Sequence, residues 1–247
     1  MPLRALPRRL YKYRPFNVNS LRLLTEAEIC YADPRRFNDP LDCNPTINVD
    51  VDRRALEHLC YQLLQDSGLN KEEAANIINE RRYSSTEYGD YENDPDADEY
   101  LKASLASDIK RLFVAEMGKK GVFSLSETWK SPLMWSHYAD EHRGICVEYD
   151  TTQIPHPNIS PVDYRIPRGV KASDLVKWKM EASPEAERRV YNTYFFAKSS
   201  EWKYEKEWRD VHQTSGVTDT RFPITGIYFG LRCDPAIITS VVKLFNG

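Results

Sequence analysis

The chain lacks the glycine-rich motifs that hold nucleotide phosphates through backbone N–H groups. Only 10 of its 247 residues are glycine, and neither the G-x-G-x-x-G fingerprint nor a P-loop occurs. The G-x-S-x-G elbow of serine hydrolases is missing as well. A bound dinucleotide would therefore have to be held by side chains and strand edges.

Cysteine, clustered metal ligands and long apolar runs are also scarce. The five cysteines are odd in number and contain no C-x-x-C pair, which argues against a disulfide framework or a zinc knot. His137 and Glu141 lie four residues apart but have no evident third ligand, so we expect no metal. No apolar run reaches transmembrane length, and the basic N-terminus has no signal-peptide core. We therefore expect a cytoplasmic protein that does not contact a membrane.

Charge is unevenly spread along the chain. The net charge of −3 argues against binding of polyanions by the whole surface. The first fourteen residues nevertheless carry five basic side chains, which could form a local patch. Residues 84–99 hold seven acidic side chains and no basic one, a composition typical of an exposed loop.

The order of expected elements indicates an α+β fold with a mostly antiparallel sheet. Alternating or β-branched segments predict strands at 10–14, 28–32, 121–126, 144–149, 162–164, 202–212, 224–231 and 238–245. Helical periodicity or capping residues predict helices after Asn19-Ser20 and at 52–82, 101–117, 133–140 and 181–197. We expect a single domain over residues 1–247, with a helical insertion at about 52–118 that includes the acidic loop.

The segment Trp202–Arg209 is the most informative stretch. If it is extended, alternation places Glu205, Glu207 and Arg209 on one face. Two carboxylates so close together need a cation, a proton or a positively charged reaction centre between them. The pair is therefore a candidate catalytic site. The alternative is a surface strand on which Lys206 and Arg209 neutralise the glutamates.

The helix expected after Ser131-Pro132 carries a second candidate feature. Serine at the N-cap followed by proline is a typical helix start. Trp135 and Tyr138 lie on adjacent faces of this helix. They either dock the helix on the sheet or form an aromatic wall for a flat ring such as a base or nicotinamide.

Six segments, taken in order, resemble domain-of-unknown-function family 2971, a bacterial family often met near phage-defence genes. They are Leu-Tyr-Lys-Tyr-Arg (10–14), Phe-Asn-Asp-Pro (37–40), Phe-Ser-Leu-Ser (123–126), Leu-Met-Trp-Ser-His-Tyr-Ala-Asp (133–140), Gly-Ile-Cys-Val-Glu-Tyr-Asp (144–150) and Trp-Lys-Tyr-Glu-Lys-Glu-Trp-Arg (202–209). The resemblance spans nearly the whole chain, but the family itself supplies no chemistry.

The same order of segments also resembles the ADP-ribosyltransferase fold, which implies a site for NAD. In that fold a first strand carries a cation that meets the nicotinamide ribose, and a late strand carries the catalytic glutamate. The resemblance gives the catalytic roles to Glu207 and Glu205. It gives cofactor binding to the first strand, the middle strand and the aromatic helix: Lys12, Tyr13 or Arg14, then Ser124 and Ser126, then Trp135 and Tyr138. Which of the three first-strand residues points inward is left open.

The implied reaction is transfer of ADP-ribose from NAD to a macromolecule. Glu207 would stabilise the positive charge that builds on the ribose, and Glu205 would orient or deprotonate the attacking group. Asn38, Asp39 and Arg209 are candidates for substrate binding. The resemblance implies a toxin or antiphage effector whose acceptor is RNA, DNA or protein, with an antitoxin or inhibitor protein as a possible partner.

Two other functions are compatible with the same residues. The first is a metal-dependent nuclease or phosphodiesterase in which Glu205, Glu207 and either Asp39 or Asp42 hold magnesium. The second is a non-catalytic sensor that binds a nucleotide or a phage protein. A nuclease of this kind would lose its activity in the presence of a metal chelator and would not require NAD. A sensor would bind its ligand without turnover.

Overall fold

The computed structural model describes residues 4–85, 95–153, 159–219 and 222–246, and the chain divides into two compact units. The first unit comprises Met1–Pro34, Lys120–Tyr164 and Lys198–Gly247. The second comprises Arg35–Lys119 and Arg165–Ala197. The helical insertion expected at 52–118 falls in the second unit, which also takes in the later segment 165–197.

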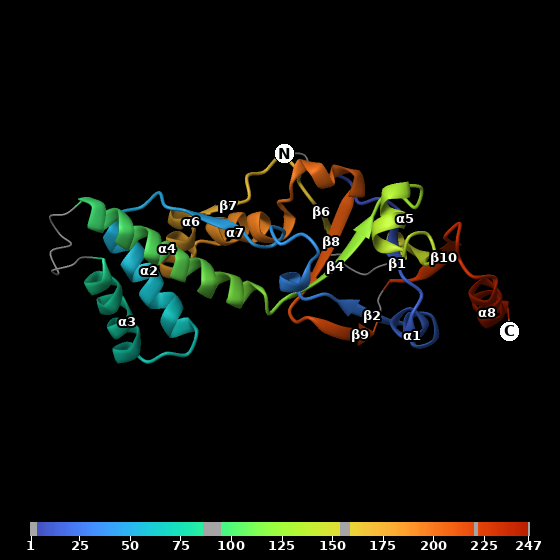
Figure 1. Ribbon diagram of the computed structural model, residues 1–247, viewed down its shortest axis with the longest axis horizontal. Coiled ribbons are helices and arrows are strands. Elements are labelled where there is room, and N and C mark those ends of the chain that lie inside the picture. Colours follow the sequence, from blue (N-terminus) through green and yellow to red (C-terminus); the bar gives the residue numbers. More distant parts are fainter. Residues whose placement is uncertain (1–3, 86–94, 154–158, 220–221, 247) are drawn as a thin grey trace. The chain divides into compact units, whose positions relative to one another are not determined.

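The first unit is built on a six-stranded sheet in which every neighbouring pair is antiparallel (Figure 1). In spatial order its strands are β10 (Ile224–Phe229), β5 (Ile145–Asp150), β1 (Arg9–Arg14), β4 (Gly121–Ser126), β8 (Glu207–His212) and β6 (Ile159–Pro161). The chain is thus a mixed α/β protein with a mostly antiparallel sheet, as its sequence predicts. The strands β1, β4 and β8, which carry the candidate site residues, are neighbours.

Side-chain alternation gives this sheet two different faces. On one face Leu10 packs with Phe123 and Trp208 beneath α1 (Val18–Glu26) and β2 (Glu28–Tyr31), which pairs with β9 (Gly216–Asp219). We name this the core face. On the other, Tyr11 and Tyr13 pack against α5 (Pro132–Tyr138). We name this the α5 face, and Figure 1 draws α1 and α5 on opposite sides of β1.

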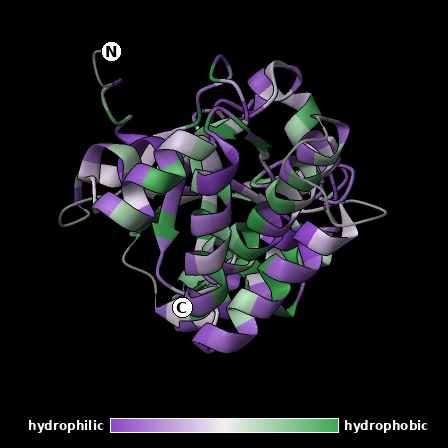
Figure 2. Cartoon of the chain, turned by 90° about the vertical axis from the view of Figure 1, so that its left-hand side faces the viewer, coloured by the Kyte–Doolittle hydropathy of each residue, from purple (hydrophilic) through white to green (hydrophobic). Residues whose placement is uncertain are grey.

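The second unit is mainly helical. It contains α2 (Arg53–Asp66), α3 (Lys71–Ser84), α4 (Pro95–Met117), α6 (Ala172–Glu181) and α7 (Pro184–Phe196), with β3 (Thr46–Asn48) parallel to β7 (Gly169–Lys171). Buried leucines recur along α2 at positions 56, 59 and 63, the spacing of one helical face. Figure 2 accordingly shows hydrophobic (green) and hydrophilic (purple) residues mixed along these helices.

Polar caps explain where the first two of these helices begin. The Asp52 side chain accepts a hydrogen bond from the backbone of Ala55 at 2.8 Å. Asn70 and Glu73 form a capping box at the start of α3. Such caps satisfy backbone N–H groups that have no partner in the helix.

The strand expected at 238–245 is wrong, because residues Pro235–Asn246 form the helix α8. The Asp234 side chain accepts a hydrogen bond from the backbone of Ala236 at 2.7 Å, and Pro235 takes the first helical position. Aspartate at the cap followed by proline starts a helix. The β-branched residues of this segment suggested a strand, but the local capping prevails.

Several other boundaries also differ from expectation. The strand expected at 162–164 lies earlier, as β6, and α1 is capped by Asn17 rather than by Asn19-Ser20. The helix expected at 181–197 begins at Pro184, after an Ala182 in the left-handed conformation. Of the acidic loop, residues 86–94 lie outside the described part of the chain, and residues 95–99 belong to α4.

Within the residues described, no helix combines the length and apolar character needed to cross a bilayer. The remaining short elements are three 3₁₀ helices, at Pro34–Arg36, Thr151–Gln153 and Ser200–Glu205.

Phe123 should be among the side chains most important for the stability of the first unit. Its ring lies 5.2–5.9 Å from the rings of Tyr31, Tyr149 and Phe222, and it is 1% exposed. We expect Phe123→Ala to lower the free energy of unfolding by about 3–5 kcal/mol, because it leaves a cavity. Urea unfolding followed by tryptophan fluorescence measures this.

The control is Val18→Ala, since Val18 is 73% exposed. It should change the free energy of unfolding by less than about 0.5 kcal/mol. Equal effects of the two substitutions would contradict the assignment of Phe123 to the core.

Candidate functional site

The two candidate glutamates lie on either side of a sharp turn. Residues Ser200–Glu205 form the 3₁₀ helix η3, and β8 begins only at Glu207. Between them Lys206 adopts a left-handed conformation with φ of 47°. The continuous strand expected over residues 202–206 is therefore wrong, and alternation does not explain why Glu205 and Glu207 face the same way.

A buried lysine brings the two glutamates together. The Nζ of Lys198 lies 3.0 Å from Oε2 of Glu207 and donates a second hydrogen bond to Oε2 of Glu205. Lys198, Glu205 and Glu207 are 5%, 3% and 5% exposed. Sequence reasoning missed Lys198. The only signal is its place directly after the apolar run Phe195-Phe196-Ala197.

Glu207 has a second cationic partner in Arg209. The guanidinium Nε lies 2.8 Å from Oε1 of Glu207, and the Nη2 lies 2.9 Å from Oε2. This two-point contact is the geometry in which arginine binds carboxylates most specifically. Arg209 has no exposed surface, so in this structure it orients Glu207. The neutralising pair is thus Lys198 and Arg209, whereas Lys206 is exposed.

The electrostatic environments of the two carboxyl groups differ. Burial alone would raise the pKa of Glu207, but the charges of Arg209 and Lys198 outweigh it and hold that pKa well below its usual value. For Glu205, burial and the neighbouring Glu207 charge raise the pKa, and Lys198 offsets them only in part. Glu207 is therefore held as a carboxylate, and Glu205 is the group that takes up a proton first.

Side chains from α5 and β4 complete the cluster. The Tyr138 hydroxyl donates to Oε1 of Glu205 at 2.6 Å. Ser126 Oγ donates to the backbone carbonyl of Glu205 at 2.7 Å, and the Ser124 hydroxyl hydrogen-bonds Glu207. We name the group Lys198, Glu205, Glu207, Arg209, Tyr138, Ser124 and Ser126 the glutamate cluster. Three segments predicted separately from the sequence thus meet on the α5 face.

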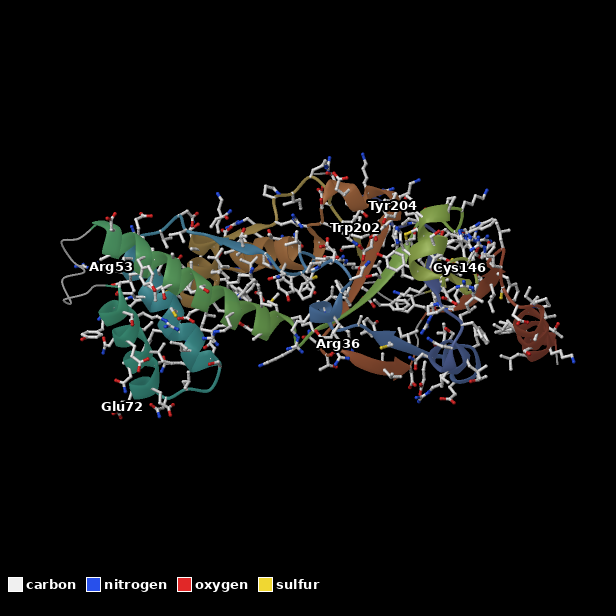
Figure 3. The ribbon with its side chains drawn as sticks, in the orientation of Figure 1. Arg36, Arg53, Glu72, Cys146, Trp202 and Tyr204 are labelled. Carbon is white, nitrogen blue, oxygen red and sulfur yellow. The ribbon has the colours of Figure 1, made fainter. Side chains whose placement is uncertain are left out.

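An aromatic surface lies beside this cluster. Trp202 and Tyr204, both on η3, are labelled in Figure 3, with ring centroids 6.0 Å apart. The Tyr204 ring lies 6.3 Å from His137 on α5, and Lys198 Nζ lies 5.2 Å from the Trp202 ring centroid. Tyr138, Trp202 and Tyr204 are only partly buried, so a flat ligand would meet them before it met the glutamates.

The first-strand candidates do not all face the cluster. Lys12 and Arg14 alternate with Leu10 and so lie on the core face, whereas Tyr13 lies on the α5 face with Glu207. Lys12 Nζ donates to the backbone carbonyl of Ser124 at 2.7 Å, and burial lowers the pKa of Lys12 to about 8. Tyr13 donates to the carbonyl of Thr128 at 2.8 Å.

The other candidates have different surroundings. Trp135 is 7% exposed, donates to the carbonyl of Trp129 at 2.7 Å and meets the Tyr13 ring edge-on, so it docks α5 on the sheet. Asn38 and Asp39 belong to the second unit, where Asp39 accepts from the backbone of Leu41 at 2.9 Å. Their part in substrate binding stays a prediction.

Residues 134–209 match the sequence profile of DUF2971, a family described as proteins of unknown function. The predicted resemblance to this family is confirmed over that segment. The match runs from α5 to the third residue of β8, so it includes Tyr138, Lys198 and both glutamates. No curated protein and no solved structure matches the chain.

The two glutamates should contribute very differently to stability. Glu207→Gln removes the carboxylate that contacts both buried cations, and loss of one partner from a buried ion pair costs about 3–5 kcal/mol. In Glu205→Gln, Glu207 still lies between Lys198 and Arg209. The new amide oxygen can still accept the hydrogen bond from Tyr138. We expect it to cost no more than about 1–2 kcal/mol. Urea unfolding at pH 7 compares the two variants, and equal losses would contradict this account.

The pH dependence provides a second check. A carboxyl group whose pKa is lowered by folding stabilises the protein fully at pH values above its ordinary pKa, which is about 4.3 for glutamate. This contribution is lost progressively as the pH falls from that value toward the lowered pKa of the folded state. The stability difference between wild type and Glu207→Gln should therefore narrow below about pH 4. A difference that widens on acidification would contradict the assignment.

Proposed function

We propose that this protein is an ADP-ribosyltransferase that uses NAD as its donor and modifies a macromolecule. The observation that carries the proposal is the convergence of Glu205 and Glu207 on one buried cation, next to Ser124, Ser126 and Tyr138. The antiparallel sheet supports it, because β1, β4 and β8, which carry the candidate residues, lie next to one another.

The buried Lys198 supports the proposal, because it shows that the two glutamates already hold a cation. Breaking the bond between ribose and nicotinamide leaves positive charge on the ribose ring, and a site already complementary to a cation stabilises that charge most in the transition state. Lysine is a compact charge on a flexible four-carbon chain. In our proposal its ammonium group swings away when NAD enters, and the ribose takes its place beside Glu207.

The remaining residues divide the other tasks. Glu205, whose pKa is raised, accepts the proton of the attacking group. Arg209 keeps Glu207 charged and oriented, and Tyr138 stacks on the nicotinamide ring. Tyr13 is the first-strand residue that fits this face of the sheet.

The biological role that we propose is that of a bacterial toxin or antiphage effector. It follows from the family resemblance, which also implies an acceptor of RNA, DNA or protein. A protein inhibitor or antitoxin would be the expected partner of such an activity.

Burial favours a second candidate function, a sensor that binds a nucleotide without turnover. Lys198, Glu205 and Glu207 are each no more than 5% exposed, as in a cluster that serves structure rather than chemistry. The metal-dependent nuclease has less support. A lysine lies between the glutamates, and no group of three possible ligands occurs in the searched parts of the chain, 4–85, 95–153, 159–219 and 222–246.

The decisive experiment is transfer of labelled ADP-ribose from NAD to host lysate, followed by digestion with protease or nuclease. Wild type should label an acceptor. Glu205→Gln, which we expect to fold, should lower the transfer rate by about 100-fold or more, since general-base catalysis contributes 10²–10⁴-fold. Glu201→Gln is the matched control, because Glu201 is an exposed glutamate of the same 3₁₀ helix.

The digestion identifies the acceptor. Label removed by nuclease indicates a nucleic acid, and label removed by protease indicates a protein. Full transfer by Glu205→Gln would overturn its catalytic role. Absence of label and of released nicotinamide with wild type, including in lysate of infected cells, would overturn the transferase and favour the sensor.

A further inference from the structure

The second unit contains a cavity of about 360 Å³ between α2 and α3, lined entirely by residues of these two helices. Its lining residues are Arg53, Arg54, Glu57, His58, Tyr61, Ala75, Ile78, Asn79 and Arg82. None belongs to the glutamate cluster, and the resemblances assign it no role.

The lining follows from helical spacing. Arg54, His58 and Tyr61 lie at i, i+4 and i+7 along α2, and so on one face of that helix. Ala75, Ile78 and Arg82 form the corresponding stripe of α3, at i, i+3 and i+7. Two helical stripes therefore face each other across the cavity.

The cavity is polar at one end and apolar at the other. The two helices run in opposite directions, so the start of α2, with Arg54 and His58, lies opposite the end of α3, with Arg82. Tyr61, Ala75 and Ile78 line the other end. A ligand that fits both ends carries an anionic group on a flat or apolar body.

The cationic end has an excess of positive charge. Three arginines line the cavity against one glutamate, in a chain whose net charge is −3. Both oxygens of Glu57 are engaged by Arg82, at 2.9 Å from Nε and 2.7 Å from Nη2, and Glu57 is 7% exposed. This contact neutralises the only carboxylate in the lining and holds the Arg82 guanidinium in place.

Arg54 and His58 differ from Arg53, Glu57, Asn79 and Arg82, which all have hydrogen-bond partners. Within the described parts of the chain neither Arg54 nor His58 has a hydrogen bond or ion pair, and both are exposed toward solvent. Arg53, labelled at the start of α2 in Figure 3, lies 3.4 Å from Asp98. The arginine fork matches the geometry of a phosphate group, and Arg54 is available to supply it.

We propose that this cavity binds a nucleoside phosphate. The phosphate lies against Arg54 and His58, with Arg82 behind them, and the base lies on Tyr61 and Ile78. Aromatic rings bind flat bases by stacking, and the cavity is of the size that small-molecule sites have. A cavity of about 360 Å³ between two helices suits one nucleotide rather than a strand of nucleic acid.

Isothermal titration of the full chain with AMP, adenosine and inorganic phosphate tests this proposal. AMP should bind at least tenfold more tightly than either adenosine or phosphate alone, because only AMP occupies both ends. Arg54→Gln and His58→Gln should each weaken AMP binding at least threefold, and the double variant at least tenfold. Neither substitution removes a packed contact, so the thermal midpoint should not change.

Arg36→Gln is the matched control, since Arg36 is an exposed arginine of the second unit outside the cavity (Figure 3). It should leave AMP binding unchanged. The proposal is overturned if adenosine binds as tightly as AMP, if Arg54→Gln binds AMP like wild type, or if only a single-stranded oligonucleotide binds. AMP binding that is lost in Glu205→Gln but kept in Arg54→Gln would also overturn it, because the nucleotide would then occupy the glutamate cluster.

This readout is independent of ADP-ribose transfer. Loss of AMP binding in the Arg54→Gln and His58→Gln variants would support the cavity site even if the chain transferred no ADP-ribose. Conversely, transfer that persisted in the Arg54→Gln variant without AMP binding in the cavity would leave the proposed function intact.

Discussion

Two buried cations and two buried carboxylates meet where η3 passes into β8, and the local structure of the first unit depends on their balance. Lys198 and Arg209 each contact Glu207, and Lys198 also contacts Glu205. Removing Glu207, the carboxylate that both cations share, leaves uncompensated positive charge in a region that water barely reaches, which is far more costly than the loss of a surface ion pair. The turn at Lys206 and the position of α5 both have to be compatible with this arrangement.

The two faces of the sheet have separate tasks. The core face is mainly apolar, although it also carries Lys12 and Arg14, and the rings of Phe123, Tyr149 and Phe222 pack together there beneath α1 and β2. The α5 face is where polar groups gather, because β4 directs its serines and β8 its Glu207 and Arg209 to that side. The strand β8 thus contributes Trp208 to the core and Glu207 to the charged cluster. A substitution that shifts the backbone of β8 would therefore affect both the packing of the core and the geometry of the cluster.

Much of the fold could be predicted from the sequence where local signals agreed. The strands around Tyr11 and Phe123 were found because alternation was clear, and the start of α5 because Ser131 and Pro132 are strong capping residues. The prediction failed where local signals conflicted. In α8 the β-branched residues suggested a strand, whereas Asp234 and Pro235 started a helix. At residues 202–206 alternation was read through a turn that the left-handed Lys206 makes.

Two glutamates, an aromatic helix and a serine-bearing strand can be recognised from the sequence alone as the chemically distinctive parts of this protein. Each is recognisable locally, since residue type and short-range spacing carry the signal. The contacts that join these parts are visible only in the folded chain. Lys198 comes from the segment between α7 and η3, and Lys12 and Arg14 lie on the opposite face of the sheet from Glu207. Lys198 meets the glutamates through the turn that η3 and the left-handed Lys206 make, and the faces of β1 and β8 are set by strand pairing over long distances along the chain. Neither the turn nor the pairing follows from residue type and alternation alone.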